Sequence, residues 1–202
     1  FDDYPDFSWS FSPQIAVNLF GGDAFTQADV LLQGGASYRI NRGLSFNLAV
    51  SQRLIGNIGD GALPSDSPLP HVRSDAALYN NGGPTMSRLT ADYVFKLAPS
   101  VYGRVSAGYL ESHFAGISTE VLWQPTAQNW GLGLEVNYVR QRAFESMFGV
   151  QDYETVTGHA SLYWDTGWNG FEAQIDVGRY LAGDWGTTLS LSRRFNNGWE
   201  LS

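Results

Sequence analysis

The sequence predicts an all-β protein: an antiparallel up-and-down transmembrane β-barrel, of which this chain supplies about ten strands. Three observations support this fold class. Apolar and polar residues alternate with period two along most of the chain, as they do in a strand with two different faces. The alternating segments are about ten residues long, enough for a tilted strand to cross a bilayer. Short and long connections alternate between them, like periplasmic turns and outer loops.

Ten segments show this alternation, namely 7–19, 28–40, 44–53, 88–97, 101–109, 117–124, 131–138, 156–165, 171–178 and 185–194. An eleventh strand begins at Trp199, three residues before the end of the sequence. We expect residues 1–202 to be one segment of a larger barrel, closed by strands from elsewhere in a longer chain. The reason is that an open sheet edge leaves backbone groups unsatisfied in hydrocarbon.

The connections predict an orientation for these strands. Short ones are expected at 41–43, 98–100, 125–129, 167–170 and 196–198, and longer ones at 21–27, 54–87, 111–116 and 143–152; the connection at 181–184 is also short. Tryptophans gather beside the short connections, at Trp9, Trp123, Trp130, Trp164, Trp168 and Trp199. Such placement is typical of an interfacial aromatic belt. A soluble, carbohydrate-binding β-sandwich would share the alternation but would need no such gathering.

Composition excludes several classes of function. The net charge of −8 makes nucleic acid an unlikely partner, because the phosphate backbone is also negative. The chain has no cysteine, which excludes disulfides, thiol catalysis and cysteine-ligated metals. No apolar stretch is long enough for a transmembrane helix. The three histidines, His71, His113 and His159, lack the spacing of a metal site. No cofactor is expected.

The polar face of the predicted strands carries fourteen charged or titratable side chains. They are Asp29, Arg39, Arg53, Arg88, Asp92, Lys96, Arg104, Glu120, Glu135, His159, Asp165, Glu172, Asp176 and Arg194. This face predicts either a lumen that passes or grips a hydrated polysaccharide, or a network of ion pairs that fills the barrel. Seven acidic and six basic residues nearly balance, which favours the network, since a charge-selective lumen would lean to one sign.

Two catalytic alternatives remain open at this stage, both for a membrane-embedded hydrolase of glycan or lipid. His159 with Ser161 and a nearby carboxylate would be a triad only if neighbouring strands bring them within hydrogen-bond reach. Glu120 and Glu135 lie on neighbouring strands and would suit a glycosidase pair. Isolated acids on a wet strand face are commoner than either arrangement, so we predict no catalytic residue.

The long connection at 54–87 is rich in proline and glycine. A connection of this length is usually either functional or disordered. Arg73 and Asp75 are candidate anchors that would hold it inside the barrel mouth, and the alternative is a mobile outer loop.

The alternation also predicts which way side chains face. Lipid cannot hydrogen-bond a charge, so each strand must turn its charged residues to the lumen. We expect Leu48, Val105, Leu134, Leu162 and Ile175 to face outward, and Arg104, Glu120, Glu135, His159 and Asp176 to face inward. If these aliphatic residues instead packed against a second layer, the membrane interpretation would be wrong.

Three segments carry a family resemblance: LPHVRSD at 69–75, TGH at 157–159 and GRYLAGD at 178–184. Together these segments make the chain resemble the barrel region of the YjbH/GfcD family, outer-membrane proteins tied to exopolysaccharide export. The resemblance runs from about residue 10 to the end of the chain. The resemblance implies a non-catalytic component of polysaccharide secretion in the bacterial outer membrane. Its implied partners are outer-membrane lipid, polysaccharide and other exopolysaccharide export proteins.

Overall fold

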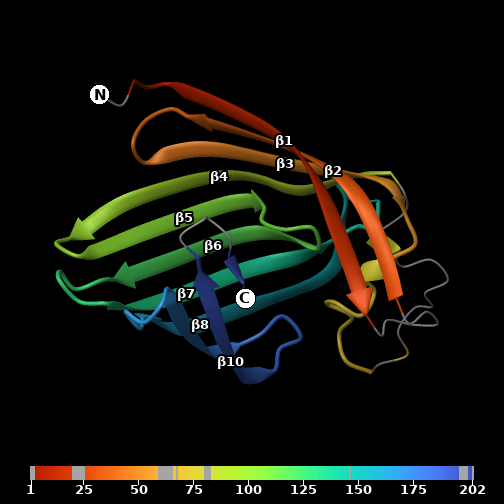
Figure 1. Ribbon diagram of the computed structural model, residues 1–202. Helices are drawn as coiled ribbons and strands as arrows, with labels where there is room; N and C mark the ends of the chain where they lie inside the picture. Colours follow the sequence, from red (N-terminus) through yellow and green to blue (C-terminus); the bar gives the residue numbers. More distant parts are fainter. Residues whose placement is uncertain are drawn as a thin grey trace. The chain divides into compact units, whose positions relative to one another are not determined.

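The structure, a computed structural model, describes residues 3–19, 26–58, 66, 68–79, 83–145, 147–195 and 200–201. In these ranges it contains eleven strands and one short 3-10 helix (Figure 1). The strands are β1 (Asp6–Leu19), β2 (Thr26–Arg39), β3 (Leu44–Gly56), β4 (Pro84–Ala98), β5 (Val101–Tyr109), β6 (Phe114–Trp123), β7 (Trp130–Arg142), β8 (Val150–Asp165), β9 (Phe171–Arg179), β10 (Trp185–Arg194) and β11 (Glu200–Leu201), and the helix is η1 (Ala76–Tyr79).

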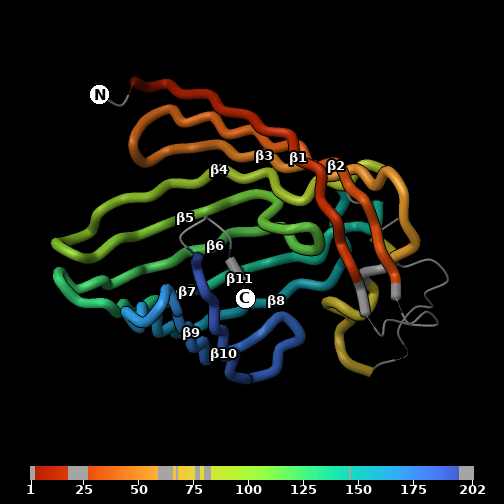
Figure 2. Tube along the Cα trace, in the orientation of Figure 1, coloured from red at the N-terminus to blue at the C-terminus, as the bar shows by residue number. Residues whose placement is uncertain are grey.

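The strands form one antiparallel sheet in chain order, from β1 to β11, which can be followed along the trace in Figure 2. The predicted meander, in which each strand pairs with the next, is therefore confirmed. Register follows the alternation, so that Leu162 lies opposite Ile175 and Ser161 lies opposite Asp176. In the described part of the chain β1 and β11 are the two ends of the strand order, which does not close into a barrel.

Several predicted boundaries were wrong; β4, for example, begins at Pro84 and not at the predicted 88. The connection between β5 and β6 is shorter than the predicted 111–116, because the Glu111 amide donates to the carbonyl of Phe114 at 3.1 Å and β6 begins there. Strand β8 begins at Val150, six positions before the predicted 156, because 150–155 pairs although it lacks apolar alternation. The predicted turn at 196–198, with Trp199, and most of the predicted connection at 21–27 lie outside the described residues.

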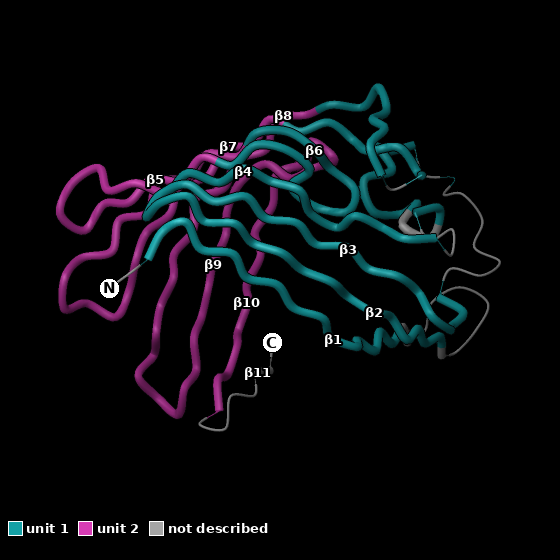
Figure 3. Tube along the Cα trace, turned by 90° about the horizontal axis from the view of Figure 1, so that it is seen from above, with its two compact units in different colours: residues 1–93, 106–117, 139–154 teal, residues 94–105, 118–138, 155–202 magenta. Residues whose placement is uncertain are grey.

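The chain divides into two compact units (Figure 3). Unit 1 consists of Phe1–Tyr93, Ser106–Ile117 and Val139–Glu154, and unit 2 of Val94–Val105, Ser118–Tyr138 and Thr155–Ser202. The side-chain contacts described below lie within one unit or the other.

Burial in this sheet is inverted relative to a soluble protein. The five aliphatic residues predicted to face outward are exposed: Leu48 39%, Val105 37%, Leu134 59%, Leu162 37% and Ile175 39%. The buried side chains are mainly polar, among them Asp29, Thr90, Asp92, Thr157 and Ser161. The buried apolar side chains of the described residues are Tyr79, Met86, Phe114 and Val139, all in unit 1. In a soluble domain, large apolar side chains would instead dominate the buried set.

Aromatic side chains cover glycines on neighbouring strands. A Cβ placed on Gly34 would lie 2.8 Å from the ring of Phe11, its partner on β1. On Gly133 it would lie 3.0 Å from the ring of Tyr163. A ring packed over a glycine shields the bare backbone and helps to fix the register of a sheet.

Candidate functional site

The polar face of unit 2 contains a cavity of about 430 Å³ over strands β6 to β10, near the strand ends joined by the β6–β7 and β8–β9 turns. Alternation places its side chains, because every second residue of a strand points to the same face. It is lined by Glu120, Leu122, Gln124, Gln128, Asn129, Trp130, Gly131, Tyr163, Trp164, Asp165, Glu172, Ala173, Gln174, Ser190 and Ser192. The lining combines carboxylates, amides, hydroxyls and aromatic rings.

Charged residues of this face are bound to one another across strands. A guanidinium nitrogen of Arg104 lies 2.8 Å from a carboxylate oxygen of Glu120, and one of Arg194 lies 3.5 Å from Glu172. The hydroxyl of Ser118 donates to Glu135 at 3.2 Å. The main-chain amide of Gly167 donates to Asp165 at 2.8 Å and closes the turn between β8 and β9.

A smaller cavity of about 160 Å³ shares Tyr163 and Gln174 with the first. Here the hydroxyl of Ser161 donates to Asp176 at 2.6 Å, and Gln174 donates to the same carboxylate at 2.9 Å. The ring of His159 packs edge-on against Tyr180, with centroids 4.6 Å apart.

This geometry is not that of a catalytic triad, because Ser161 bonds directly to a carboxylate and His159 does not stand between them. The Nε2 atom of His159 is buried without a hydrogen-bond partner in the described residues. Glu120 and Glu135 are each held by a different neighbour, Arg104 and Ser118. No group of three or more metal-binding side chains occurs within the described ranges.

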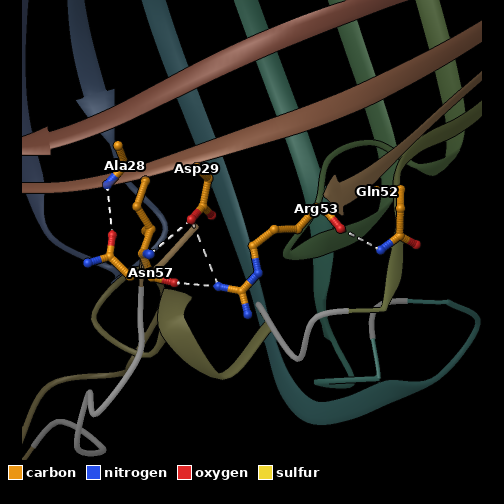
Figure 4. Close-up of polar contacts among 6 residues, drawn as sticks. Ala28, Asp29, Gln52, Arg53 and Asn57 are labelled. Atoms are coloured by element: carbon orange, nitrogen blue, oxygen red, sulfur yellow. Dashed lines mark hydrogen bonds and ion pairs between the residues drawn. The ribbon is translucent and has the colours of Figure 1, made fainter. Parts of the chain in front are cut away.

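In unit 1 the polar face carries a second charged cluster, shown in Figure 4. Asp29, which is 3% exposed, accepts a hydrogen bond from the Ile58 amide at 2.9 Å and lies 3.9 Å from Arg53. Arg53 donates to the Ile58 carbonyl at 3.1 Å, and Asn57 accepts from the Ala28 amide at 2.9 Å. The cluster fastens the end of β3 to β2.

The other predicted polar-face residues of unit 1 lie apart from this cluster. Arg39 pairs with Asp6 at 3.6 Å on the exposed surface. Asp92 accepts hydrogen bonds from Asn47 at 2.7 Å and Thr90 at 2.6 Å. Arg88 is exposed on β4. Three predicted arginines of this unit thus occupy three separate surroundings.

Within unit 1, the segment at 68–79 makes polar contacts through Arg73 and Asp75. Arg73 donates to Glu111 at 2.7 Å and to Nδ1 of His113 at 2.9 Å. Asp75 bonds to Nδ1 of His71 at 2.9 Å. Because an arginine can only donate, Nδ1 of His113 must be unprotonated. Burial and the positive charge of Arg73 lower the pKa of His113 below its ordinary value of 6.5, which keeps the ring neutral.

Tyr79 and Arg142 connect this segment to the end of β7. Arg142 is fully buried and donates to the carbonyls of Met86 at 2.6 Å, Glu111 at 2.8 Å and Met147 at 3.0 Å. Burial raises the pKa of the Tyr79 hydroxyl above 10.0, so it stays protonated and donates to the Arg142 carbonyl.

Two important residues, Tyr163 and Arg142, were not predicted from the sequence. Tyr163 lines both cavities, but an aromatic residue on the polar face does not fit the apolar–polar alternation. The signal that could have found it is its spacing of two residues from Ser161 and from Asp165, which places it on the polar face. Arg142 shares the strand parity of the apolar residues of β7, so its burial beneath neighbouring loops left no trace in the alternation.

Among the described residues, no helix has the length and hydrophobicity needed to cross a membrane.

The sequence of the chain is similar to that of known proteins. No solved structure matches it. A protein of Escherichia coli (strain K12), named "Uncharacterized lipoprotein YjbH", is 40% identical over 139 residues, which are 67% of this chain and 20% of that protein. The chain thus aligns with about a fifth of that relative. The family model described as "Exopolysaccharide biosynthesis protein YbjH" matches residues 1–202. The chain therefore belongs to the YjbH family of exopolysaccharide biosynthesis proteins.

Proposed function

We propose that this chain forms part of the wall of an outer-membrane β-barrel that assists the secretion or assembly of an exopolysaccharide. In this proposal the apolar face lies against lipid and the polar face borders the route of the polymer. The observation that carries it is the row of exposed large apolar side chains on one face of the sheet, such as Leu134 at 59% and Leu189 at 73%.

Physical chemistry favours lipid as the cover of this face. Monomeric soluble proteins rarely expose a continuous large apolar surface, whereas lipid accepts it at no cost. The paired strands satisfy each other's backbone groups, as hydrocarbon requires. Strands β1 to β10 have 9 to 16 residues and so reach the roughly 9–11 residues that a tilted membrane strand needs.

The aromatic residues fit a membrane interface. Trp123 and Trp130 flank the turn between β6 and β7, with rings 5.4 Å apart, and Trp164 and Trp168 lie beside the turn between β8 and β9. Indole has an apolar body and one hydrogen-bond donor, which suits the boundary between lipid and water. Barrels of this kind are typical of the bacterial outer membrane.

We further propose that strands beyond those described complete the barrel, because β1 and β11 would otherwise leave open edges in lipid. The polymer is taken from the family description, and the secretion role from the resemblance to the YjbH/GfcD family. We assign the chain no catalytic role, since Ser161, His159 and the two glutamates lack a catalytic arrangement. Its partners would be lipid, the polysaccharide and other exopolysaccharide export proteins.

Single cysteines test the placement of the two faces, because the chain has none of its own. Leu134→Cys and Leu162→Cys should be labelled in membranes by a lipid-soluble maleimide and be protected from a charged one. Thr188→Cys and Ser190→Cys, at exposed positions on the polar face of β10, should show the opposite preference. Equal labelling of both faces by the charged reagent would mean that no lipid covers the sheet.

Secretion tests the role. A deletion strain should release less extracellular polysaccharide while its cytoplasmic synthesis continues, and unchanged secretion would refute the proposal. Alanine variants at Glu120, Glu135, His159 and Asp165 test the hydrolase alternative through the cleavage of glycan or lipid by the purified protein. Cleavage by the unsubstituted protein that a folded, membrane-inserted alanine variant loses would point to the hydrolase.

A further inference from the structure

We propose that the two adjoining cavities of unit 2 form a binding site for an uncharged stretch of polysaccharide, made of sugars that carry hydroxyl groups and no acidic groups. This inference rests on the proposed function and adds to it the class of polymer that the polar face accepts.

The two cavities adjoin each other, because two residues line both. They measure about 430 Å³ and 160 Å³, and Tyr163 and Gln174 line both. Pockets for small ligands commonly measure about 300–1,000 Å³. Two linked spaces over one sheet face suit successive sugar units of a polymer better than one compact molecule.

Tyr163 supplies an aromatic surface within this site. A Cβ on Gly133 would lie 3.0 Å from its ring, so the ring lies across the β7 backbone and also borders both cavities. Gly131 and Gly133 leave no side chain standing on this part of β7. The apolar C–H face of a pyranose ring can pack on such a surface while its hydroxyl groups point to the rim.

The rim offers groups that both donate and accept. The amides of Gln124, Gln128 and Gln174 and the hydroxyls of Ser190 and Ser192 line the larger cavity. A sugar hydroxyl also donates and accepts, so amides and hydroxyls match it in either direction. Carboxylates add acceptors that two adjacent hydroxyl groups can share.

The charges of the lining select against acidic polymers. Glu120, Asp165 and Glu172 line the larger cavity, and Glu135 and Asp176 line the smaller one. Among the described residues no lysine or arginine lines either cavity. Arg104 and Arg194 balance the charges of Glu120 and Glu172. Asp165, Glu135 and Asp176 have no ion-pair partner among the described residues, so the lining keeps a net negative charge. Clustered charge of one sign in a cleft repels ions of the same sign, so a uronic acid chain would be excluded and a neutral one admitted.

The test measures binding to the full-length protein in detergent. The probes are neutral hexasaccharides of glucose, galactose and mannose, and a galacturonic acid hexasaccharide of equal length. At least one neutral probe should bind at least about tenfold more tightly than the acidic one, a difference of about 1.4 kcal/mol. Binding of none of the neutral probes, or tighter binding of the acidic probe, would overturn the inference.

Tyr163→Ser should weaken binding of the neutral probe by about tenfold, as expected when an aromatic contact is lost. Tyr138→Ser is the matched control, because Tyr138 is exposed on the apolar face of β7 and should leave binding unchanged. Equal effects of the two substitutions would contradict a site at Tyr163.

Glu172→Gln tests the charge argument without removing the aromatic ring. It removes the ion pair with Arg194 and one negative charge from the lining. It should therefore strengthen binding of the acidic probe at least about threefold at low salt, with little change for the neutral probe. The matched control Asp152→Asn also removes an acid from an arginine, since Asp152 lies 3.5 Å from Arg140, but Asp152 lines neither cavity. If Asp152→Asn strengthens binding of the acidic probe more than Glu172→Gln does, the charge argument for this site is wrong.

The outcomes separate this inference from the proposed function. Correct cysteine labelling and normal secretion without binding of a neutral probe would overturn the site alone. Binding of the neutral probe by a protein whose apolar face reacts with the charged maleimide would overturn the membrane role alone.

Discussion

The hydroxyl of Tyr79 donates a hydrogen bond to the main-chain carbonyl of Arg142 at 2.8 Å, across 63 positions of sequence. Gln151 donates to the same carbonyl at 2.8 Å, while the Arg142 side chain donates to three carbonyls from three other segments of unit 1. The two residues therefore hold the 68–79 segment to the end of β7.

Replacing Arg142 by alanine should cost about 3 kcal/mol of unfolding free energy, because three main-chain carbonyls would each lose a bond worth about 1 kcal/mol. Chemical denaturation of the protein in lipid vesicles measures this. Arg140→Ala is the matched control, since Arg140 lies on the same strand but its side chain is exposed and bonds to Gln151 and Asp152. It should cost about 1 kcal/mol or less. A similar loss for both variants would contradict the role given to Arg142.

Gly56→Ala should disrupt the cluster around Asp29. Gly56 has a φ of +150°, and a Cβ there would lie 2.5 Å from the Cα of Asp29. Backbone strain of this kind costs about 1–3 kcal/mol, and the clash adds to it. Gly35→Ala is the control, because its nearest neighbour would be the Ser10 hydroxyl at 3.3 Å. Thermal unfolding should show a clear loss for Gly56→Ala and a small one for Gly35→Ala; the reverse order would refute this account.

Acidification should loosen the 68–79 segment through His113. Its pKa is lowered in the folded state, so the unfolded chain binds the proton more readily. The contribution of His113 is therefore complete above its ordinary pKa of 6.5 and is lost as the pH falls below that value. Hydrogen exchange of residues 68–79, expressed relative to the intrinsic exchange rate at each pH, should accelerate between about pH 7 and about pH 5.

The control for this prediction is His113→Gln in a His71→Gln background, which removes the other histidine of the segment. A glutamine oxygen can still accept from Arg73 but does not titrate. The acceleration should persist in the His71→Gln parent and disappear in the double variant. If both proteins respond alike to pH, His113 is not the titrating group.

Leu134→Arg distinguishes a lipid-covered face from a wet one. Leu134 lies near the middle of β7 and is 59% exposed, so an arginine there would be nearly neutral for stability in water. In a bilayer it should cost about 2–4 kcal/mol. Ser190→Arg, on the polar face, is the control and should cost little. Equal stability of the two variants in lipid vesicles would contradict membrane insertion of the apolar face.

The sequence by itself determined the all-β class, the antiparallel strand order and the two faces of the sheet. The reason is that a period of two is a local property: once Leu134 is apolar and Glu135 is charged, their opposite directions follow from the strand alone. The exposed aliphatic residues could thus be named without any contact between distant segments. Boundaries failed where the alternation lapsed, as at Phe114 and Val150.

Only the tertiary structure decided which charges meet. The sequence counted seven acids against six bases as nearly balanced, but strand register and turns place Glu120, Asp165 and Glu172 around one cavity that no described lysine or arginine lines. It also buried Arg142, which alternation assigns to the apolar face, because loops fold over the end of β7 and offer it carbonyl acceptors. The face to which a side chain points depends only on its position along the strand. The pairing of charges depends instead on strand register and on loops that join residues far apart in the sequence, so a local pattern cannot predict it.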